Sequence, residues 1–173
     1  MNTRQISDSQ TSDSQPKTRV REVRAGDVPA IAEFQTTCWR EAYRGVVPQE
    51  YLDRVGVEDR ELRWGERLAS GCRRIALAEI GSDIVGVVSW GLADVDDAPA
   101  LELMSLYVAA DQRGTGLAVT LTHRAVAGSP AHLWVFDDNP RAKRFYGKRG
   151  FRFDGHRRLD PDTGLWEQRY VRR

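Results

Sequence analysis

The chain has 173 residues, which is enough for one domain with a sizeable core and too few for two. Its 26 Lys and Arg residues nearly balance its 25 Asp and Glu residues, so the formal net charge is only +1. A charge this small gives no global attraction to nucleic acid or to an acidic membrane surface. No apolar run reaches the ~18 residues of a transmembrane helix, and the N-terminal region lacks the apolar stretch of a secretory signal. We therefore expect a cytoplasmic protein that binds neither nucleic acid nor a membrane.

Residues 1–17 are mostly Ser, Thr, Gln, Asn and Asp, which predicts a disordered tail, and residues 18–173 are expected to form a single domain. Thr18–Arg24 alternates weakly around two valines, a pattern typical of a half-exposed strand. A helix is predicted to begin after Asp27, as its N-cap, and to end near Tyr43. Next we expect an extended segment, a short helical turn and a second helix, over Val46–Pro48, Gln49–Arg54 and Val57–Ser70.

The remaining chain predicts six strands and two helices. The strands are expected over Arg74–Ile80, Ile84–Trp90, Leu101–Val108, Ala131–Phe136, Phe151–Arg157 and Leu165–Arg172, and the helices over Thr115–Ala127 and 139–150. The first two of these strands should form a hairpin. Leu101–Val108 is apolar except at Glu102 and Ser105, which is typical of a central strand covered on both faces. This order predicts an α/β fold: a mixed, largely antiparallel sheet of six to seven strands with helices on both faces.

The most informative motif is Arg113-Gly114-Thr115-Gly116-Leu117-Ala118, between a predicted strand and a predicted helix. Two glycines one residue apart let backbone N–H groups surround an anion, and the helix that follows directs its first unpaired N–H groups to the same place. The motif therefore predicts a pyrophosphate site, with a purely structural corner as the alternative. It is no Walker A loop, because no Gly-Lys-Ser/Thr follows. A Rossmann fingerprint fits less well, since Val119 occupies the third glycine position, although Asp137 follows at about the expected distance.

Two segments together resemble the signatures of the GCN5-related N-acetyltransferase (GNAT) family. Residues 113–118 are similar to its Arg/Gln-x-x-Gly-x-Gly/Ala motif, with Ala118 where many members have glycine. Asn139, Phe145-Tyr146 and Gly150-Phe151 are similar to its second motif, and Trp39-Arg40-Glu41-Ala42-Tyr43-Arg44-Gly45 looks like a segment frequent among bacterial members. The resemblance covers about residues 18–173. It implies central strands that splay apart, acetyl-CoA as donor co-substrate and a primary amine of a small molecule or peptide as acceptor.

The resemblance also implies roles for particular residues. The splayed strand offers backbone groups of Leu106, Tyr107 and Val108 to the acetyl carbonyl and the pantetheine arm. The turn formed by Arg113, Gly114, Thr115, Gly116, Leu117 and Ala118 holds the pyrophosphate. Asn139 either contacts the amide arm of the co-substrate or is simply a cap or turn residue. Similar proteins often pair through the last strands, so a homodimer is one alternative for this chain.

Acetyl transfer passes through a tetrahedral oxyanion and expels a thiolate. A strand N–H near Tyr107 is the expected oxyanion donor, and Tyr146 is expected to protonate the thiolate, unless it is only a core residue. The attacking amine must be neutral, and Glu102 is the expected base, with a solvated strand-end carboxylate as its alternative and Glu41 as a weaker second base. His123 and His132 are expected to be surface or packing residues.

Other polar clusters predict no further site. No metal is expected, and Cys38 and Cys72 are predicted to be small buried or half-buried residues. The acidic loop is expected to be solvated, and attraction of a cationic amine is the alternative; it contains Asp94, Asp96 and Asp97. The basic C-terminal strands show no interleaved aromatic platform, and with a net charge near zero they predict no nucleic-acid surface; their arginines are Arg157, Arg158, Arg169, Arg172 and Arg173. Two functions other than acetyl transfer remain open: a non-catalytic CoA-binding module and a nucleotide-dependent oxidoreductase.

Overall fold

The structure is a computed structural model that describes residues 17–43 and 56–173. The predicted tail over residues 1–17 falls outside this part except for Lys17, and so do the predicted extended segment 46–48 and helical turn 49–54.

Seven strands form one sheet in the spatial order β1-β2-β3-β4-β5-β7-β6. They are β1 (Arg19–Glu22), β2 (Arg73–Ile80), β3 (Asp83–Leu92), β4 (Leu101–Val108), β5 (Ala131–Phe136), β6 (Arg152–Leu159) and β7 (Trp166–Arg172). Every neighbouring pair is antiparallel except β4 and β5, which run parallel. The predicted mixed, largely antiparallel sheet is confirmed. A Rossmann fold needs a parallel sheet, so that interpretation of the glycine motif is wrong.

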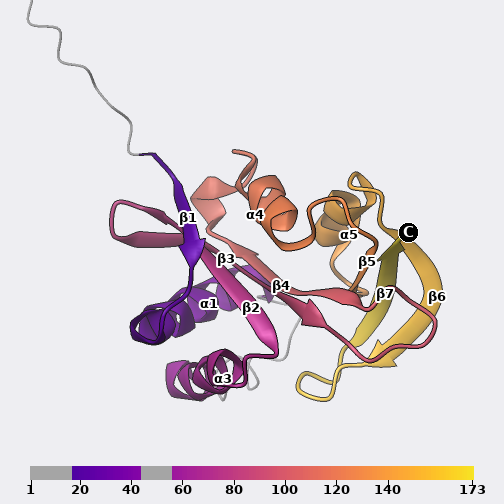
Figure 1. Ribbon diagram of the computed structural model, residues 1–173, viewed down its shortest axis with the longest axis horizontal. Helices are drawn as coiled ribbons and strands as arrows, with labels where there is room; N and C mark the ends of the chain where they lie inside the picture. Colours follow the sequence, from indigo (N-terminus) through magenta and orange to yellow (C-terminus); the bar gives the residue numbers. More distant parts are fainter. Residues whose placement is uncertain (1–16, 44–55) are drawn as a thin grey trace, which may run out of the picture.

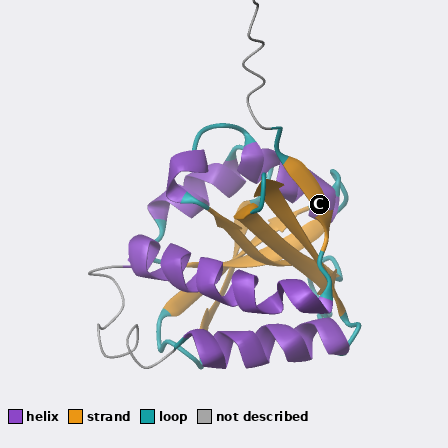
Figure 2. Ribbon diagram, turned by 90° about the vertical axis from the view of Figure 1, so that its left-hand side faces the viewer, coloured by secondary structure: helices purple, strands orange, loops and turns teal. Residues whose placement is uncertain are grey.

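Helices cover both faces of the sheet (Figure 1 and Figure 2). The α-helices are α1 (Val28–Tyr43), α3 (Val57–Ala69), α4 (Leu117–Val126) and α5 (Pro140–Gly147), and short 3-10 turns span η1 (Ala25–Asp27) and η2 (Ala110–Gln112). In Figure 1, α1 and α3 lie on one side of the strands and α4 and α5 on the other. No helix of the described residues is long and apolar enough to span a membrane.

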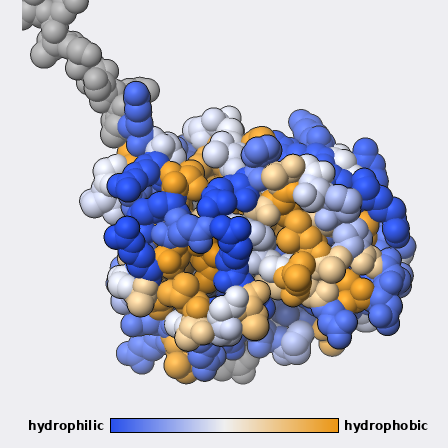
Figure 3. All heavy atoms as spheres, in the orientation of Figure 1, coloured by the Kyte–Doolittle hydropathy of each residue, from blue (hydrophilic) through white to orange (hydrophobic). Residues whose placement is uncertain are grey.

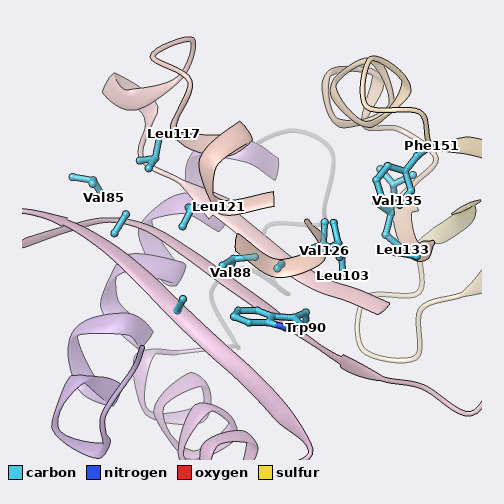
Figure 4. Close-up of a cluster of buried hydrophobic side chains, with 14 residues drawn as sticks. Val85, Val88, Trp90, Leu103, Leu117, Leu121, Val126, Leu133, Val135 and Phe151 are labelled. Carbon is cyan, nitrogen blue, oxygen red and sulfur yellow. The ribbon is translucent and has the colours of Figure 1, made fainter. Parts of the chain in front are cut away.

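Two hydrophobic clusters hold these layers together. On the α1 and α3 side, Ile31 and Trp64 pack against Leu77 and Val87 of the sheet. On the other side the core runs from α4 to the strands near the C-terminus, and Figure 4 shows its larger side chains: Val85, Val88, Trp90, Leu103, Leu117, Leu121, Val126, Leu133, Val135 and Phe151. On the molecular face of Figure 3, hydrophobic residues gather in areas bordered by hydrophilic ones.

Two local expectations need correction. Asp27 does not cap α1 as its N-cap; it ends η1, and its carboxylate accepts the Arg24 N–H at 2.7 Å. The strand β4 lies at the centre of the sheet, but only Leu103 in it is buried, and its other residues are half-buried. The reason is that two cavities open beside this strand.

Candidate active site

The site begins where two parallel strands separate. In the described structure β4 and β5 are in register at a single pair, Glu102 opposite His132. Just after it β4 contains a bulge, because Leu103 lies opposite Trp90 and Ser105 opposite Ser89, which leaves Met104 as the extra residue. Beyond the bulge β4 follows β3 and leaves β5. The expected splay of the central strands is therefore present.

The splay leaves backbone groups of β4 without a strand partner. The Ala109 N–H donates to the Val85 carbonyl of β3 at 3.0 Å. Because backbone groups alternate sides along a strand, Tyr107 also directs its N–H toward β3, whereas Leu106 and Val108 direct theirs into the gap. The backbone N–H groups near Tyr107 that can donate to an oxyanion in the gap are therefore those of Leu106 and Val108.

A cavity of about 280 Å³ lies beside this gap, between α1, the end of β4, the glycine turn and α5. Among the residues predicted for the co-substrate and for catalysis, those that line it are Leu106, Tyr107, Val108, Arg113, Gly114, Ala118, Asn139 and Tyr146. Three residues predicted for the co-substrate do not line it: Thr115 and Gly116 are exposed in the turn, and the Leu117 side chain is buried in the core. Of these three, only Gly116 has a backbone N–H without an acceptor in the described structure, because the N–H groups of Thr115 and Leu117 donate within the turn.

The glycine turn presents several unused N–H groups. Gly114 and Gly116 have φ of 87° and 95°, in the left-handed region that favours glycine. Within the described structure, the N–H groups of Gly114, Gly116 and Ala118 donate no hydrogen bond, whereas that of Thr115 donates to the Gln112 carbonyl. Three free donors at alternate positions, next to the first turn of α4, form a concave anion site.

Cationic and sulfur-containing side chains also border the first cavity. Arg113 lines it and contacts the Glu41 carboxylate at 3.4 Å. Glu41, the weaker of the two expected bases, therefore lies beside the first cavity. Cys38 is buried against the same cavity, and burial raises the pKa of its thiol to about 11. Cys72, in contrast with its prediction, is exposed.

A second cavity of about 360 Å³ lies on the other side of the gap, between α1, α3, β4, β5 and the turn that joins β6 to β7. Glu102 lines it. The two cavities share a set of lining residues: Tyr43, Leu106, Tyr107, Asn139, Ala142 and Tyr146. The cavities therefore meet at the splay, where a group held in one reaches a group held in the other.

Tyr146 lies at this junction. Its ring packs against Phe145 and Phe151, with ring centroids 5.1 and 6.0 Å apart. Burial, with smaller contributions from Tyr43 and Tyr107, raises the pKa of Tyr146 above its ordinary value of 10. The phenol therefore keeps its proton throughout the neutral range and is available as a donor.

Asn139 has a structural role in this arrangement. Its Oδ1 accepts the Ala142 N–H at 3.0 Å as the N-cap of α5, and its Nδ2 donates to the Tyr43 hydroxyl at 3.4 Å. The capping alternative is thus present, and a contact with the co-substrate stays a prediction. Its position at both cavities keeps that prediction open.

His132 is a packing residue, one of its two expected environments, and it has polar neighbours. It is fully buried, and its Nδ1 lies 2.6 Å from the Pro99 carbonyl while its Nε2 lies 3.5 Å from Glu102 Oε2. Burial opposes a charge on this ring, but the interactions with Glu102 and Pro99 outweigh it and raise the pKa of His132. The expected base Glu102 thus has a buried imidazole as its neighbour. His123 is exposed, as expected.

The acidic loop and the basic C-terminal strands bind each other. The buried guanidinium of Arg169 donates to both carboxylate oxygens of Asp97 at 2.7 and 2.9 Å and to Asp154 at 2.7 Å. Arg157 and Arg158 pair with Asp137 and Glu167, respectively. The expectation that the loop is merely solvated is therefore wrong for Asp97, and Asp94 and Asp96 are exposed. No group of potential metal ligands occurs among the described residues.

Sequence analysis missed the side chains that α1 and α3 bring to the second cavity. Gln35 of α1 accepts from Trp64 Nε1 at 2.8 Å and donates to the Tyr107 hydroxyl at 2.8 Å, so a buried chain connects α3 to β4. Arg67 and Arg73 also line this cavity. Their helical and strand positions were predicted, but no local pattern indicates that these elements meet.

Comparison with known proteins agrees with this geometry. The sequence model of the Acetyltransferase (GNAT) family matches residues 29–151. The chain belongs to this family. A probable N-acetyltransferase of Mycobacterium tuberculosis, Rv2775, is 28% identical over 142 residues, which are 79% of this chain and 81% of that protein. The uncharacterized N-acetyltransferase YuaI of Bacillus subtilis is 26% identical over 128 residues, 70% of this chain and 73% of that one.

Solved structures show the same fold. The PaiA N-acetyltransferase of Thermoplasma acidophilum, solved in complex with coenzyme A, superposes with a TM-score of 0.70 at 17% identity, over 90% of this chain and 99% of that one. A mutant of the SpeG spermidine N-acetyltransferase of Vibrio cholerae gives a TM-score of 0.61 at 19% identity, over 92% and 94% of the two chains. The seven-stranded sheet with its splay is thus the GNAT fold.

Proposed function

We propose that this GNAT protein transfers an acetyl group from acetyl-CoA to the primary amine of a small molecule or peptide, by direct attack of the amine. The observation that carries the proposal is the meeting of two cavities at the splay of β4 and β5, with Tyr146 lining both. The first cavity is assigned to the donor and the second to the acceptor. The coenzyme A in the Thermoplasma structure supports this donor.

Donor binding is assigned to backbone groups and one arginine. The free N–H groups of Gly114, Gly116 and Ala118 would hold the pyrophosphate, and Arg113 would add a positive charge at the edge of the same cavity. The N–H groups of Leu106 and Val108 would bind the pantetheine arm and the acetyl carbonyl. A fixed donor at the developing oxyanion typically contributes about 3 kcal/mol of barrier lowering.

The reaction moves one proton from nitrogen to sulfur. The amine nitrogen attacks the acetyl carbon, the N–C bond forms, and the C–S bond breaks. Glu102 lines the acceptor cavity and would take the proton from nitrogen, while Tyr146 lines both cavities and would donate a proton to the thiolate. A phenol whose pKa is raised gives its proton up only if another replaces it, so the proton released by the amine must return to Tyr146.

Direct attack is favoured over an acetylated enzyme. Cys38 is the thiol that lines the donor cavity in the described structure. A thiol attacks as its thiolate, and burial raises the pKa of Cys38 to about 11, so it stays protonated near neutral pH. Replacement of Cys38 by Ala or Ser is therefore expected to leave acetyl transfer active.

Two broader expectations remain proposals. We propose that the protein acts in the cytoplasm on a small-molecule or peptide amine. We also propose that copies can pair along β6, which is an edge strand of the sheet and has Phe153 and Leu159 exposed, with Trp166 of β7 exposed beside it. Sedimentation across a range of protein concentrations tests the pairing, and a monomer at all of them contradicts it.

The central experiment measures binding and transfer separately. Calorimetry with acetyl-CoA is expected to detect binding, and release of the free thiol is expected only when an amine is added from a panel of amino acids, polyamines, aminoglycosides and peptides. The spermidine acetyltransferase among the structural neighbours makes polyamines a useful arm of this panel. Binding without transfer to any amine would instead favour a non-catalytic CoA-binding module. Absence of acetyl-CoA binding would refute both.

A further inference from the structure

Several arginines line the acceptor cavity, and two of them, Arg67 and Arg73, form no ion pair within the described residues. Arg60, Arg63 and Arg67 follow one another along α3 at intervals of three and four residues, which places them on one side of the helix, and all three line the cavity. Arg73, at the start of β2, lines it as well. Arg63 pairs with Asp162 at 2.8 Å, but within the described structure Arg67 and Arg73 form no ion pair.

The carboxylates of the same cavity already have partners. Glu102 lies beside His132, and Asp162 pairs with Arg63. The Asp160 carboxylate accepts the N–H and the hydroxyl of Thr163 at 3.0 and 2.6 Å, and Glu167 accepts from Arg158 at 2.7 Å. Within the described residues, none of these carboxylates forms an ion pair with Arg67 or Arg73.

The two arginines are close to each other and half-buried. Burial, followed by the charge of Arg73, lowers the pKa of Arg67 below its ordinary value, which is the effect expected of a guanidinium without a counterion. Removing such a group from water is costly unless an anion pairs with it. Among the described residues this pair has no anionic partner, so a bound anion would be favoured beside it.

The sheet places these charges across from the expected base. Arg73 lies opposite Gly91 of β3, and Gly91 lies opposite Glu102 of β4, so all three share one row across the strands. Directly paired residues project to the same face, and Gly91 places no side chain between the other two. Two strand spacings separate Arg73 from Glu102, about 10 Å between their backbones. A small acceptor can therefore reach both ends of the row.

We infer that the acceptor is a small amine that also carries an oxyanion, a carboxylate or a phosphate, and that Arg67 and Arg73 bind this oxyanion while the amine lies near Glu102. The inference rests on the proposed acetyl transfer and narrows its acceptor. Guanidinium groups bind both kinds of oxyanion through paired hydrogen bonds. The same two charges repel a polycation, so polyamines are poor acceptors.

The first test compares acceptors that differ only in the anionic group. Amino acids are paired with their carboxamides, phosphoethanolamine is paired with ethanolamine, and spermidine is the polycation. Rates of thiol release are corrected for the fraction of unprotonated amine. We expect kcat/KM for at least one anionic member to exceed that of its neutral partner by about tenfold or more. The two pairs show whether the group is a carboxylate or a phosphate. Equal or higher rates with the neutral partners, or with spermidine, would overturn the inference.

The second test removes the arginines. Arg67→Gln and Arg73→Gln are expected to abolish the preference for the anionic acceptor and to leave the affinity for acetyl-CoA unchanged. Arg74→Gln is the matched control, because Arg74 is adjacent in sequence, is exposed and pairs with Glu22 of β1. A preference that survives in both Arg67→Gln and Arg73→Gln would contradict the assignment.

A third measurement does not depend on turnover. Calorimetry compares the N-acetylated anionic products with N-acetylated neutral ones in the wild type and in Arg73→Gln. Tighter binding of an anionic product that disappears in the variant supports the anion site even if no amine is acetylated, in which case the proposed function alone fails. Equal binding of anionic and neutral products refutes the anion site and leaves acetyl transfer untouched.

Discussion

The replacement Tyr146→Phe tests the proposed acid directly, because it removes one oxygen atom and retains the ring. The ring packs between Phe145 and Phe151, and these contacts persist in the variant. Within the described structure, the Tyr146 hydroxyl forms no hydrogen bond with another side chain that its loss would leave unpaired. We therefore expect the folded structure and the acetyl-CoA affinity to change little.

The expected loss lies in turnover. A positioned general acid contributes about 10²–10⁴-fold, which corresponds to about 3–5 kcal/mol of activation free energy. Tyr146 lines both cavities at the splay, where the thiolate would form, and the raised pKa keeps it protonated. We expect kcat to fall within this range. Since the pKa of Tyr146 is raised, kcat of the wild type should show no decrease from loss of this proton up to the ordinary tyrosine pKa of 10.

The assay combines steady-state thiol release with calorimetry of acetyl-CoA. Tyr170→Phe is the control, since Tyr170 lies on β7 outside both cavities and its ring packs against Phe153. Turnover of Tyr146→Phe within twofold of the wild type would refute the acid role. An equal loss of turnover in Tyr170→Phe would show that the effect is general to the fold.

Three further predictions concern the turn, the loop and the buried histidine. Gly114→Ala places a Cβ on a residue with φ of 87°, which costs about 1–2 kcal/mol in stability, and it is expected to weaken acetyl-CoA binding about tenfold or more. The control Gly155→Ala, also at positive φ, should lower stability without changing this affinity. Equal acetyl-CoA affinities of Gly114→Ala and the wild type in calorimetry would contradict the prediction. Hydrogen bonds from Arg169 lower the pKa of Asp97 to about 2 from 3.8, so its contribution to stability is present above 3.8 and is lost as the pH falls through about 2. Acid unfolding of Asp97→Asn should lack this component, and an identical acid transition would argue against it. The raised pKa of His132 gives the opposite pH dependence: its contribution to the free energy of unfolding is complete below pH 6.5 and is lost as the pH rises through the pKa of the folded state. Denaturation of the wild type and of His132→Gln across this range should show a difference in unfolding free energy that becomes smaller as the pH rises.

Local patterns in the sequence predicted most of the fold. The strand Leu101–Val108 has the predicted bounds. Gly114 and Gly116 lie in a turn between β4 and α4, as predicted, and both adopt a positive φ, which glycine takes without strain. The family resemblance then gave the correct order of strands and the splay.

Features that depend on the packing of distant segments were not predictable in this way. The bulge at Met104 decides that Leu106 and Val108 direct their N–H groups into the gap, and no residue type in β4 marks it. Arg67 and Arg73 line the same cavity as Glu102 only because α3 packs against the sheet beside the start of β2. The sequence predicted the strand β2 and the amphipathic helix α3, but it did not predict how the two are placed relative to each other.

His132 connects the position of the splay to the chemistry proposed there. It supplies the β5 side of the one pair that joins β4 and β5 in the described structure. Its Nδ1 contacts the carbonyl of Pro99, which precedes β4, and its Nε2 lies 3.5 Å from the Glu102 carboxylate. The last point of contact between the strands therefore coincides with the expected base. Because the gap opens immediately beyond this pair, a substitution at His132 is expected to shift both the carboxylate and the start of the gap. We therefore expect His132→Gln to lower turnover and to change the shape of the pH profile of kcat/KM. A purely structural residue would instead lower kcat/KM equally at every pH.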